Sequence, residues 1–218
     1  FRSGWIASPS AVSYLGDPTR VRVFYVGLEF DPLDARTGEI LDLVEVPLWT
    51  IEEIRVERAA DELRVHLRSW RVETTTAVTR TDIYTGDEDT NLYRGFFGTR
   101  FPNGLALQVA GQQYSTQSRR TDDAGDELSP FTRLGWARGP WSIDATMVRA
   151  GRNRGIQEAT DPTRRPIPPL DARRSDAYLR VGYGDPARSG TWAQVIAGSQ
   201  AFRETTPGTG ITPADPDD

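Results

Sequence analysis

Polar and apolar residues alternate with a period of two along most of the chain after about Thr76. This alternation predicts β-strands with one apolar and one polar face, and no segment of this region has the helical period of 3.6 residues. Turn residues such as Gly, Pro, Asn and Asp separate the alternating segments. Seven strands are predicted, at residues 78–86, 91–101, 105–116, 131–138, 141–150, 176–183 and 191–202.

The lengths of these strands and of their connections indicate an unusual sheet. Several strands have about ten residues, close to the ~9–11 that a tilted strand needs to cross a bilayer, whereas globular strands usually have about 5–6. Tight turns at 102–104 and 138–140 alternate with long polar connections at 117–128 and 152–174. Outer-membrane barrels carry short turns on one rim and long loops on the other. Residues 76–218 are therefore predicted to be the first antiparallel strands of an up-and-down transmembrane β-barrel.

The two faces of the predicted strands differ in chemistry. On the apolar face, the residues expected to contact lipid are Tyr93, Phe97, Leu107, Val109, Ile143 and Leu179. On the opposite face, the charged candidate site residues are Arg94, Arg100, Arg133, Asp144, Asp176 and Arg180. In a barrel these six face the lumen, where they line a path for polar solutes or hold a plug through salt bridges. In a soluble sandwich they point to water. The strand at 191–202 has no clear face.

Two further expectations follow from the barrel hypothesis. A charge at Val109, near the membrane midplane, should cost about 2–4 kcal/mol, whereas Gln108→Arg on the lumen face should be almost neutral. Aromatic residues near the strand ends should form an interfacial girdle, namely Phe101, Phe131, Trp136, Trp141, Tyr183 and Trp192.

The first region, residues 1–75, contains short mixed segments in place of long alternating strands. Residues 21–26 are rich in β-formers and turn at Gly27. Thr50 and Glu53 have the spacing of a helix capping box, and the segment then continues as an alternating strand to Arg58. Residues 63–68 alternate again. A small α+β module is predicted, joined to the second region near residues 72–76.

Composition narrows the classes of function. The chain has 218 residues, of which 37% are hydrophobic and 10% aromatic, too many for a disordered protein. A net charge of -5 argues against a nucleic-acid partner. The absence of cysteine excludes disulfides, thiol nucleophiles and cysteine metal sites, and all 26 basic residues are Arg. No apolar run approaches the ~18–20 residues of a membrane-spanning helix.

Candidate chemistry for catalysis is sparse. His66 is the single histidine, and no serine lies in a nucleophile elbow, so we expect no enzyme, no metal and no cofactor. The acidic runs at 86–89 and 122–127 are interpreted as solvated loop tips, with calcium binding as the alternative. Arginine pairs at 119–120, 164–165 and 173–174 are interpreted as solvated loop residues.

Two segments resemble motifs of the TonB-dependent outer-membrane receptors, in which a plug precedes a barrel. Residues 23–27 resemble the first plug strand and its turn. Residues 46–58 resemble the later plug motif, with Ile51, Glu52, Ile54, Val56 and Arg58 in register. Ala59 stands where the family has Gly, and residues 63–70 replace the Gly-rich strand that usually closes the plug. The resemblance covers about residues 20–86.

This resemblance implies an outer-membrane receptor or transporter that takes up an unidentified small solute across the bacterial outer membrane. It also implies outer-membrane lipid as the surroundings and a TonB-type energy-coupling protein as a further partner. Seven strands leave open edges that lipid does not tolerate, so a full barrel needs more chain after Asp218. The alternative, from another class, is a soluble extracellular or periplasmic β-sandwich binding module, for instance for carbohydrate.

Overall fold

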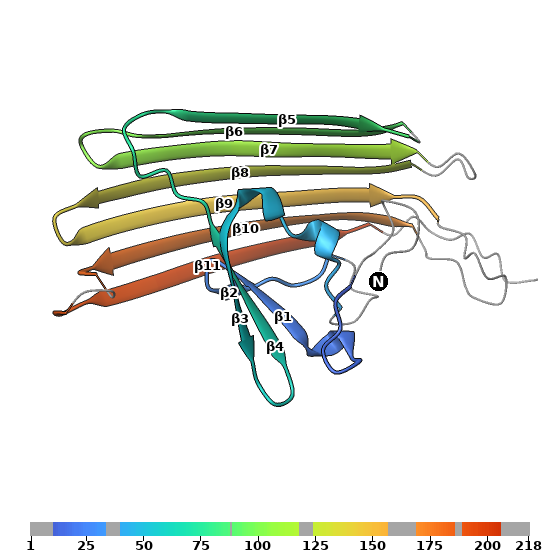
Figure 1. Cartoon of the computed structure of the whole chain (residues 1–218), viewed down its shortest axis with the longest axis horizontal. Helices are drawn as coiled ribbons and strands as arrows, with labels where there is room; N and C mark the ends of the chain where they lie inside the picture. The colour runs from blue at the N-terminus through green and yellow to red at the C-terminus, as the bar shows by residue number, and fades with distance from the viewer. Residues whose placement is uncertain are drawn as a thin grey trace, which may run out of the picture.

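The protein is mainly β and contains two sheets (Figure 1). The computed structural model describes residues 11–33, 40–87, 89–117, 124–156, 169–185 and 189–205. Within these residues a small, mixed four-stranded sheet precedes a seven-stranded antiparallel open sheet, and no α-helix occurs. In the same part of the chain, no helix has the length and apolarity needed to cross a membrane.

The seven-stranded sheet follows chain order. Each strand pairs only with its neighbours in sequence, so β5 and β11 form the two edges. The strands are β5 (Val78–Gly86), β6 (Thr90–Arg100), β7 (Leu105–Gln117), β8 (Ala124–Arg138), β9 (Trp141–Arg154), β10 (Leu170–Tyr183) and β11 (Ala193–Glu204). All seven predicted strands are thus confirmed in position and order.

Strands β8, β9 and β10 extend beyond their predicted ends into segments that the sequence assigned to loops. Strand β8 begins at Ala124 instead of Phe131, and β10 begins at Leu170 instead of Asp176. In these extensions polar residues lie on both faces, as Asp126 and Glu127 do in β8, so no apolar–polar alternation marks a strand there. The predicted contrast between short turns and long loops is correspondingly weaker. The segments between strands are 87–89, 118–123 and 155–169 at one end of the sheet, against 101–104, 139–140 and 184–192 at the other.

The small sheet has the order β2-β1-β4-β3. Its strands are β1 (Val21–Tyr25), β2 (Leu28–Glu29), β3 (Ile51–Arg58) and β4 (Leu63–Ser69), with short 3-10 helices at Pro18–Arg20, Leu43–Glu45 and Leu48–Thr50. Strands β1 and β4 are parallel, and the other two pairs are antiparallel. The turn predicted at Gly27 is confirmed, and both Val26 and Gly27 have positive φ angles, as a tight hairpin turn requires.

The helix predicted to begin at Thr50 is absent, so the α+β prediction for this module is wrong in its α part. Thr50 instead ends a 3-10 turn, and its buried hydroxyl donates a 2.7 Å hydrogen bond to the carbonyl oxygen of Pro47. Glu53 lies within β3. The β-branched residues that follow Thr50 at alternating positions favour a strand, and β4 provides the backbone partners for it.

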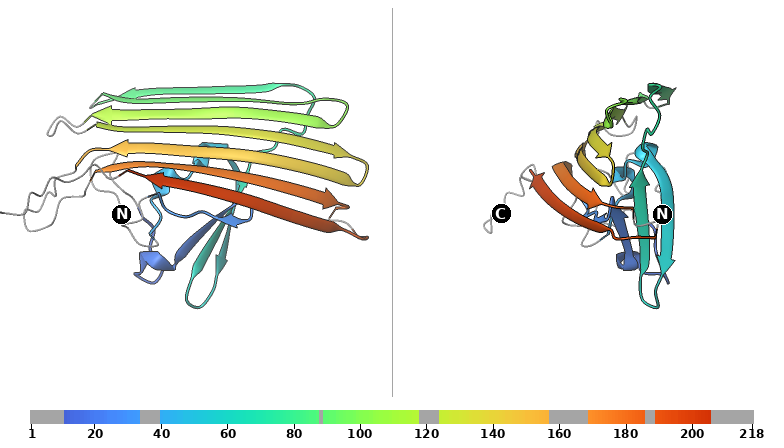
Figure 2. Two further views of the ribbon diagram at one scale, coloured as in Figure 1. Left: turned by 180° about the vertical axis from the view of Figure 1, so that it is seen from behind. Right: turned by 90° about the vertical axis from the view of Figure 1, so that its left-hand side faces the viewer.

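The small sheet packs against one face of the large sheet, on its concave side (Figure 2). A shared hydrophobic core joins the two sheets. It contains Val23, Tyr25, Phe30, Leu67 and Val72 from the first region and Phe96, Ala110, Phe131, Val148 and Tyr178 from the large sheet. Trp70 stacks on Phe96 with ring centroids 4.5 Å apart. We call the face of the large sheet that contacts the small sheet the inner face, and the opposite one the outer face.

Two glycines of the inner face allow this close approach. A Cβ atom on Gly98 would lie 2.6 Å from Cγ2 of Val72, and a Cβ atom on Gly198 would clash with Leu28. We expect Gly98→Ala to lower the free energy of unfolding by about 1–3 kcal/mol, because the short Val72 side chain cannot move aside. Gly95→Ala, on the outer face of the same strand with open space around it, is the control and should change stability by less than about 0.5 kcal/mol. Denaturant unfolding measures both, and equal effects would contradict this packing.

Candidate functional site

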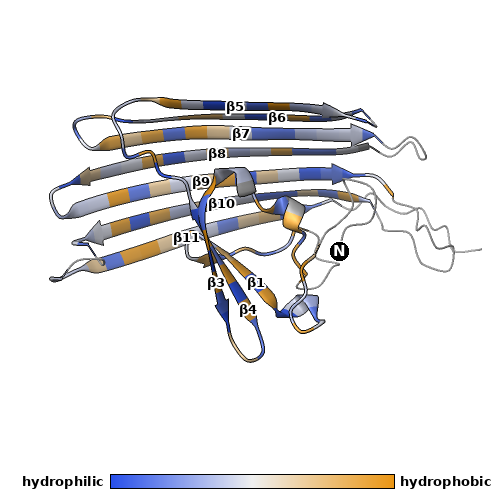
Figure 3. Ribbon diagram, in the orientation of Figure 1, coloured by the Kyte–Doolittle hydropathy of each residue, from blue (hydrophilic) through white to orange (hydrophobic). Residues whose placement is uncertain are grey.

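Polar and apolar residues alternate along the strands of the large sheet (Figure 3). Beside the shared core, many polar side chains of the inner face are buried, and many large apolar side chains of the outer face are exposed. Gln108 and Val109 are neighbours on β7, and their exposed fractions are 1% and 44%. The buried polar residues of the inner face are Thr90, Gln108, Gln112, Thr116, Glu127, Ser129, Arg133, Thr146, Arg152, Arg154, Arg174 and Asp176. The small sheet and the segments around it cover this face.

The outer face is apolar near the tight turns and polar near the opposite end. Of the six residues expected to contact lipid, Tyr93, Phe97, Val109, Ile143 and Leu179 are exposed on this face and Leu107 is half-buried there. Toward the other end the outward residues are polar, among them Gln113, Gln117, Arg149, Asn153 and Arg173. The faces of β11 are also clear in the structure, because Ala193, Val195 and Ala197 pair with outward residues of β10.

Aromatic residues mark the tight-turn end of the sheet. Trp141 and Tyr183 pair edge to face with ring centroids 5.0 Å apart, and Phe101 and Trp192 are exposed at the same end. Phe131, predicted to belong to this girdle, does not. It is 2% exposed and lies on the inner face in the interior of β8, because that strand begins earlier than predicted.

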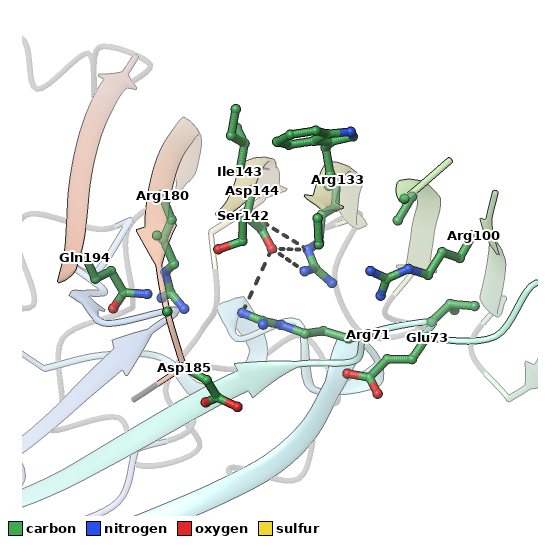
Figure 4. A pocket seen from close by; sticks show the side chains of 18 of the residues that line it. Arg71, Glu73, Arg100, Arg133, Ser142, Ile143, Asp144, Arg180, Asp185 and Gln194 are labelled. Carbon is green, nitrogen blue, oxygen red and sulfur yellow. Dashed lines mark hydrogen bonds and ion pairs between the residues drawn. The ribbon is translucent and has the colours of Figure 1, made fainter. Parts of the chain in front are cut away.

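Four of the six predicted site residues line one pocket on the inner face. Arg100 of β6, Arg133 of β8, Asp144 of β9 and Arg180 of β10 surround a cavity of about 400 Å³ (Figure 4). Their proximity follows from the register of the sheet, in which Arg180 lies opposite Asp144 and Asp144 lies opposite Gly135, two residues from Arg133. Arg71, from the segment between the two sheets, enters the cavity from the opposite side.

Arg133 and Asp144 form the best-connected ion pair of the pocket. Nε of Arg133 donates to both carboxylate oxygens of Asp144 at 3.0 and 2.8 Å, and Nη2 also contacts Asp144. Nη1 of Arg133 donates to Oε1 of Gln108 at 2.9 Å. Arg180 donates from Nη2 to the carbonyl oxygen of Val26 at 3.0 Å, which connects β10 to the β1–β2 turn.

Gln108 connects the large sheet to the segment that leads into it. Its Nε2 donates to the carbonyl oxygen of Trp70 at 2.8 Å, and its Oε1 accepts from the backbone N–H of Val72 at 3.2 Å. Gln108→Arg is therefore expected to destabilise the protein and not to be almost neutral. The side chain does not face open space, and an added guanidinium would be buried beside Arg133 with these hydrogen bonds lost.

Arg94 and Asp176 share the inner face but lie outside the pocket. Nε of Arg94 donates to Oε1 of Gln112 at 2.7 Å. Asp176 forms an ion pair with Nε of Arg174 at 3.0 Å, and Arg174 also donates to the carbonyl oxygen of Asp31. The guanidinium of Arg174 lies 3.6 Å from the centre of the Phe30 ring. The six predicted site residues thus share one face of the sheet, but they make separate contacts and do not form one site.

Several charged residues of the interface were not identified from the sequence. Arg152, which pairs with Asp42, and Arg174 were assigned to loops, so strand alternation was not applied to them. The interpretation of 173–174 as solvated loop residues is wrong for Arg174, which is buried, whereas Arg173 is exposed but lies in β10. It is also wrong for Glu127, which is buried in β8 and accepts a hydrogen bond from Ser129. If β8, β9 and β10 had been predicted at their full lengths, the alternation of faces would have assigned these residues to the inner face. Residues 118–123 and 164–165 lie outside the described part of the chain.

His66 lies in the small sheet. His66 is half-buried, stacks on Phe24 with ring centroids 4.9 Å apart, and has Nε2 3.4 Å from Glu57. Across the described ranges, no group of three or more His, Cys, Asp or Glu side chains could hold a metal ion.

Glu45 gives the interface a dependence on pH. Its side chain is 3% exposed and accepts a 2.8 Å hydrogen bond from the N–H of Leu33, and burial raises its pKa from 4.5 to about 8. The folded chain therefore keeps a proton that the unfolded chain releases, and stability should fall as the pH rises from about 4.5 to 8. Glu45→Gln retains an acceptor for Leu33 and should flatten this slope, raising stability at pH 8.5 by on the order of 1–3 kcal/mol.

Thermal unfolding between pH 5 and 8.5 measures the effect. Glu53→Gln on β3, where the side chain is 40% exposed, is the control and should keep the shape of the wild-type profile. Parallel profiles for Glu45→Gln and the wild type would contradict a buried carboxyl with a raised pKa.

Comparison of the sequence with known protein families gives no match, and no characterised protein matches it either. The arrangement of the inner and outer faces therefore carries the functional argument.

Proposed function

We propose that the chain is part of an outer-membrane β-barrel protein of the TonB-dependent receptor type. Residues 76–218 contribute strands of the barrel wall and residues 1–75 a plug-like module on its inner face. The function is uptake of a small solute across the bacterial outer membrane. The observation that supports this proposal most is the distribution of polarity, with large apolar side chains exposed on the outer face and many buried polar side chains on the inner face that the module covers.

The reversal favours a lipid environment over a soluble sandwich. A soluble sandwich buries its apolar face against a second sheet and exposes its polar face to water. Here the second sheet covers the polar face, and the large residues exposed on the outer face include Val109, Leu134, Ile143, Met147 and Leu179. A continuous apolar surface of this kind is rare on a monomeric soluble protein, because water penalises it.

The inner-face contacts are of the kind that holds a plug. Gln108 bonds the connecting segment, Arg180 bonds the β1–β2 turn, and Arg174 and Arg152 contact Asp31 and Asp42. Passage of a solute between module and wall requires some of these contacts to open. A TonB-type energy-coupling protein is the partner that would supply the work in this proposal.

The edges of the large sheet are part of the proposal. Strands β5 and β11 each have one side without a strand partner among the described residues. Unpaired backbone groups are too costly to face hydrocarbon, so the proposed barrel includes further strands that pair with both edges.

Vesicle flotation tests the proposal. The full-length protein that contains this chain, folded in detergent and diluted into phospholipid vesicles, should float with the vesicles through a density gradient and resist extraction by high salt and carbonate. The soluble-module alternative predicts that the protein stays at the bottom of the gradient and unfolds cooperatively in detergent-free buffer. Recovery in that soluble form would refute the proposal.

A further inference from the structure

The pocket lined by Arg100, Arg133 and Arg180 has more positive than negative groups. Five arginines line it, Arg68, Arg71, Arg100, Arg133 and Arg180, against the three carboxylates Glu73, Asp144 and Asp185. Arg68 is paired at 2.9 Å with Glu53 outside the cavity, which leaves an excess of one positive charge. We call this cavity the arginine pocket. The guanidiniums of Arg180, Arg71, Arg133 and Arg100 succeed one another across it (Figure 4).

The carboxylate at the centre of the arginine pocket is already engaged. Both oxygens of Asp144 accept hydrogen bonds from Nε of Arg133. Arg71 comes no nearer to Asp144 than 3.9 Å, which is beyond hydrogen-bond distance. Arg100 forms no ion pair within the described residues. The pairing inside the pocket therefore leaves guanidinium donors unused.

Arg71 has a guanidinium donor without an acceptor. Its Nε atom is buried and makes no hydrogen bond within the described structure. Burial lowers the pKa of its guanidinium, and the neighbouring Arg133 and Arg180 add to this effect. A buried donor without an acceptor destabilises a structure, and an anion beside it would remove that cost.

We propose that the arginine pocket binds a small oxyanion of the phosphate class carrying at least two negative charges. Arg100 and Arg71 supply its first contacts, because planar guanidiniums bind oxyanions through pairs of N–H groups. Arg180 is fixed by Val26 and Arg133 by Asp144 and Gln108, so both add oriented positive charge with little loss of side-chain freedom. This site lies on the inner face, so its ligand comes from water and its existence does not depend on lipid.

Calorimetric titration of the whole chain in detergent, at constant ionic strength in chloride buffer, tests the proposal. Pyrophosphate and inorganic phosphate are the probes. We expect saturable binding with one site, and pyrophosphate should bind more tightly than phosphate. Arg71→Gln and Arg100→Gln should each weaken pyrophosphate binding at least tenfold.

Arg149→Gln is the matched control. It removes the same charge from the exposed outer face of β9 and should leave the dissociation constant unchanged. Arg100→Lys tests geometry, and its affinity should fall between those of the wild type and Arg100→Gln. Limited proteolysis of each variant checks that the fold is kept.

Three results would overturn the proposal. These are the absence of saturable binding by the folded wild type, an equal loss of binding in Arg149→Gln, and tighter binding of dihexanoyl phosphatidic acid than of pyrophosphate. Tighter binding of dihexanoyl phosphatidic acid would mean that the arginine pocket binds lipid headgroups and not a small oxyanion from water. Failure of the protein to float with vesicles would instead contradict only the proposed membrane function.

Discussion

Val109→Arg should destabilise the protein by about 2–4 kcal/mol when it is folded in lipid vesicles. Val109 lies in the middle of the apolar part of β7 on the outer face, so the proposed barrel places the new charge near the bilayer midplane. The side chain is already 44% exposed, so no core packing is lost and the cost arises from the surroundings alone. Denaturant unfolding of the vesicle-bound protein measures the difference.

Gln113→Arg is the matched control for this substitution. Gln113 lies on the same face of the same strand, two residues beyond Gly111, where the outward residues are polar. The expected cost is about 0–1 kcal/mol, because the new charge would lie near the membrane interface. If Val109→Arg were as mild as Gln113→Arg in vesicles, the outer face would not contact hydrocarbon.

Asp144→Ala should lower the free energy of unfolding by about 3–5 kcal/mol. The carboxylate is the partner of Arg133, whose side chain is almost fully buried, and it is also the nearest carboxylate contact of Arg71. Its removal leaves two guanidiniums close together with no compensating charge. The double variant Arg133→Met with Asp144→Leu should recover most of this loss, because an apolar pair of similar volume replaces the charges.

Asp82→Ala is the control for the ion pair. Asp82 pairs with Arg80 at 3.2 Å on the edge strand β5, where both side chains are exposed. An exposed pair contributes at most about 1 kcal/mol, so this variant should unfold almost as the wild type does. Comparable losses for Asp82→Ala and Asp144→Ala would show that burial does not set the strength of the Arg133–Asp144 pair.

The strands of the large sheet could be predicted from the sequence because strict alternation fixes both the strand and its two faces. Val109 and Gln108 were assigned to opposite faces on this basis, and their exposed fractions agree. Strand ends were predicted wrongly where polar residues lie on both faces and no alternation is visible. The start of β8 has polar residues on both faces, so Glu127 was taken for a loop residue and Phe131 for a rim residue.

The contacts between the two regions could not be predicted, because alternation says nothing about what covers a face. Arg100, Arg133, Asp144 and Arg180 were identified as facing one way, but their common pocket depends on strand register. Arg71 lies outside any strand and has no local signal. The helix expected at Thr50 failed for a related reason, since the capping-box spacing also fits a turn that leads into a strand.

Site-directed labelling of the outer face tests the central proposal most directly. Val109→Cys, in a chain that has no other cysteine, should react in vesicles with a maleimide restricted to the bilayer and resist a water-soluble maleimide. Gln113→Cys should react with the water-soluble reagent, and Gln108→Cys, covered by the module, with neither. Reaction of Val109→Cys with the water-soluble reagent as fast as that of Gln113→Cys would contradict a lipid-facing outer surface.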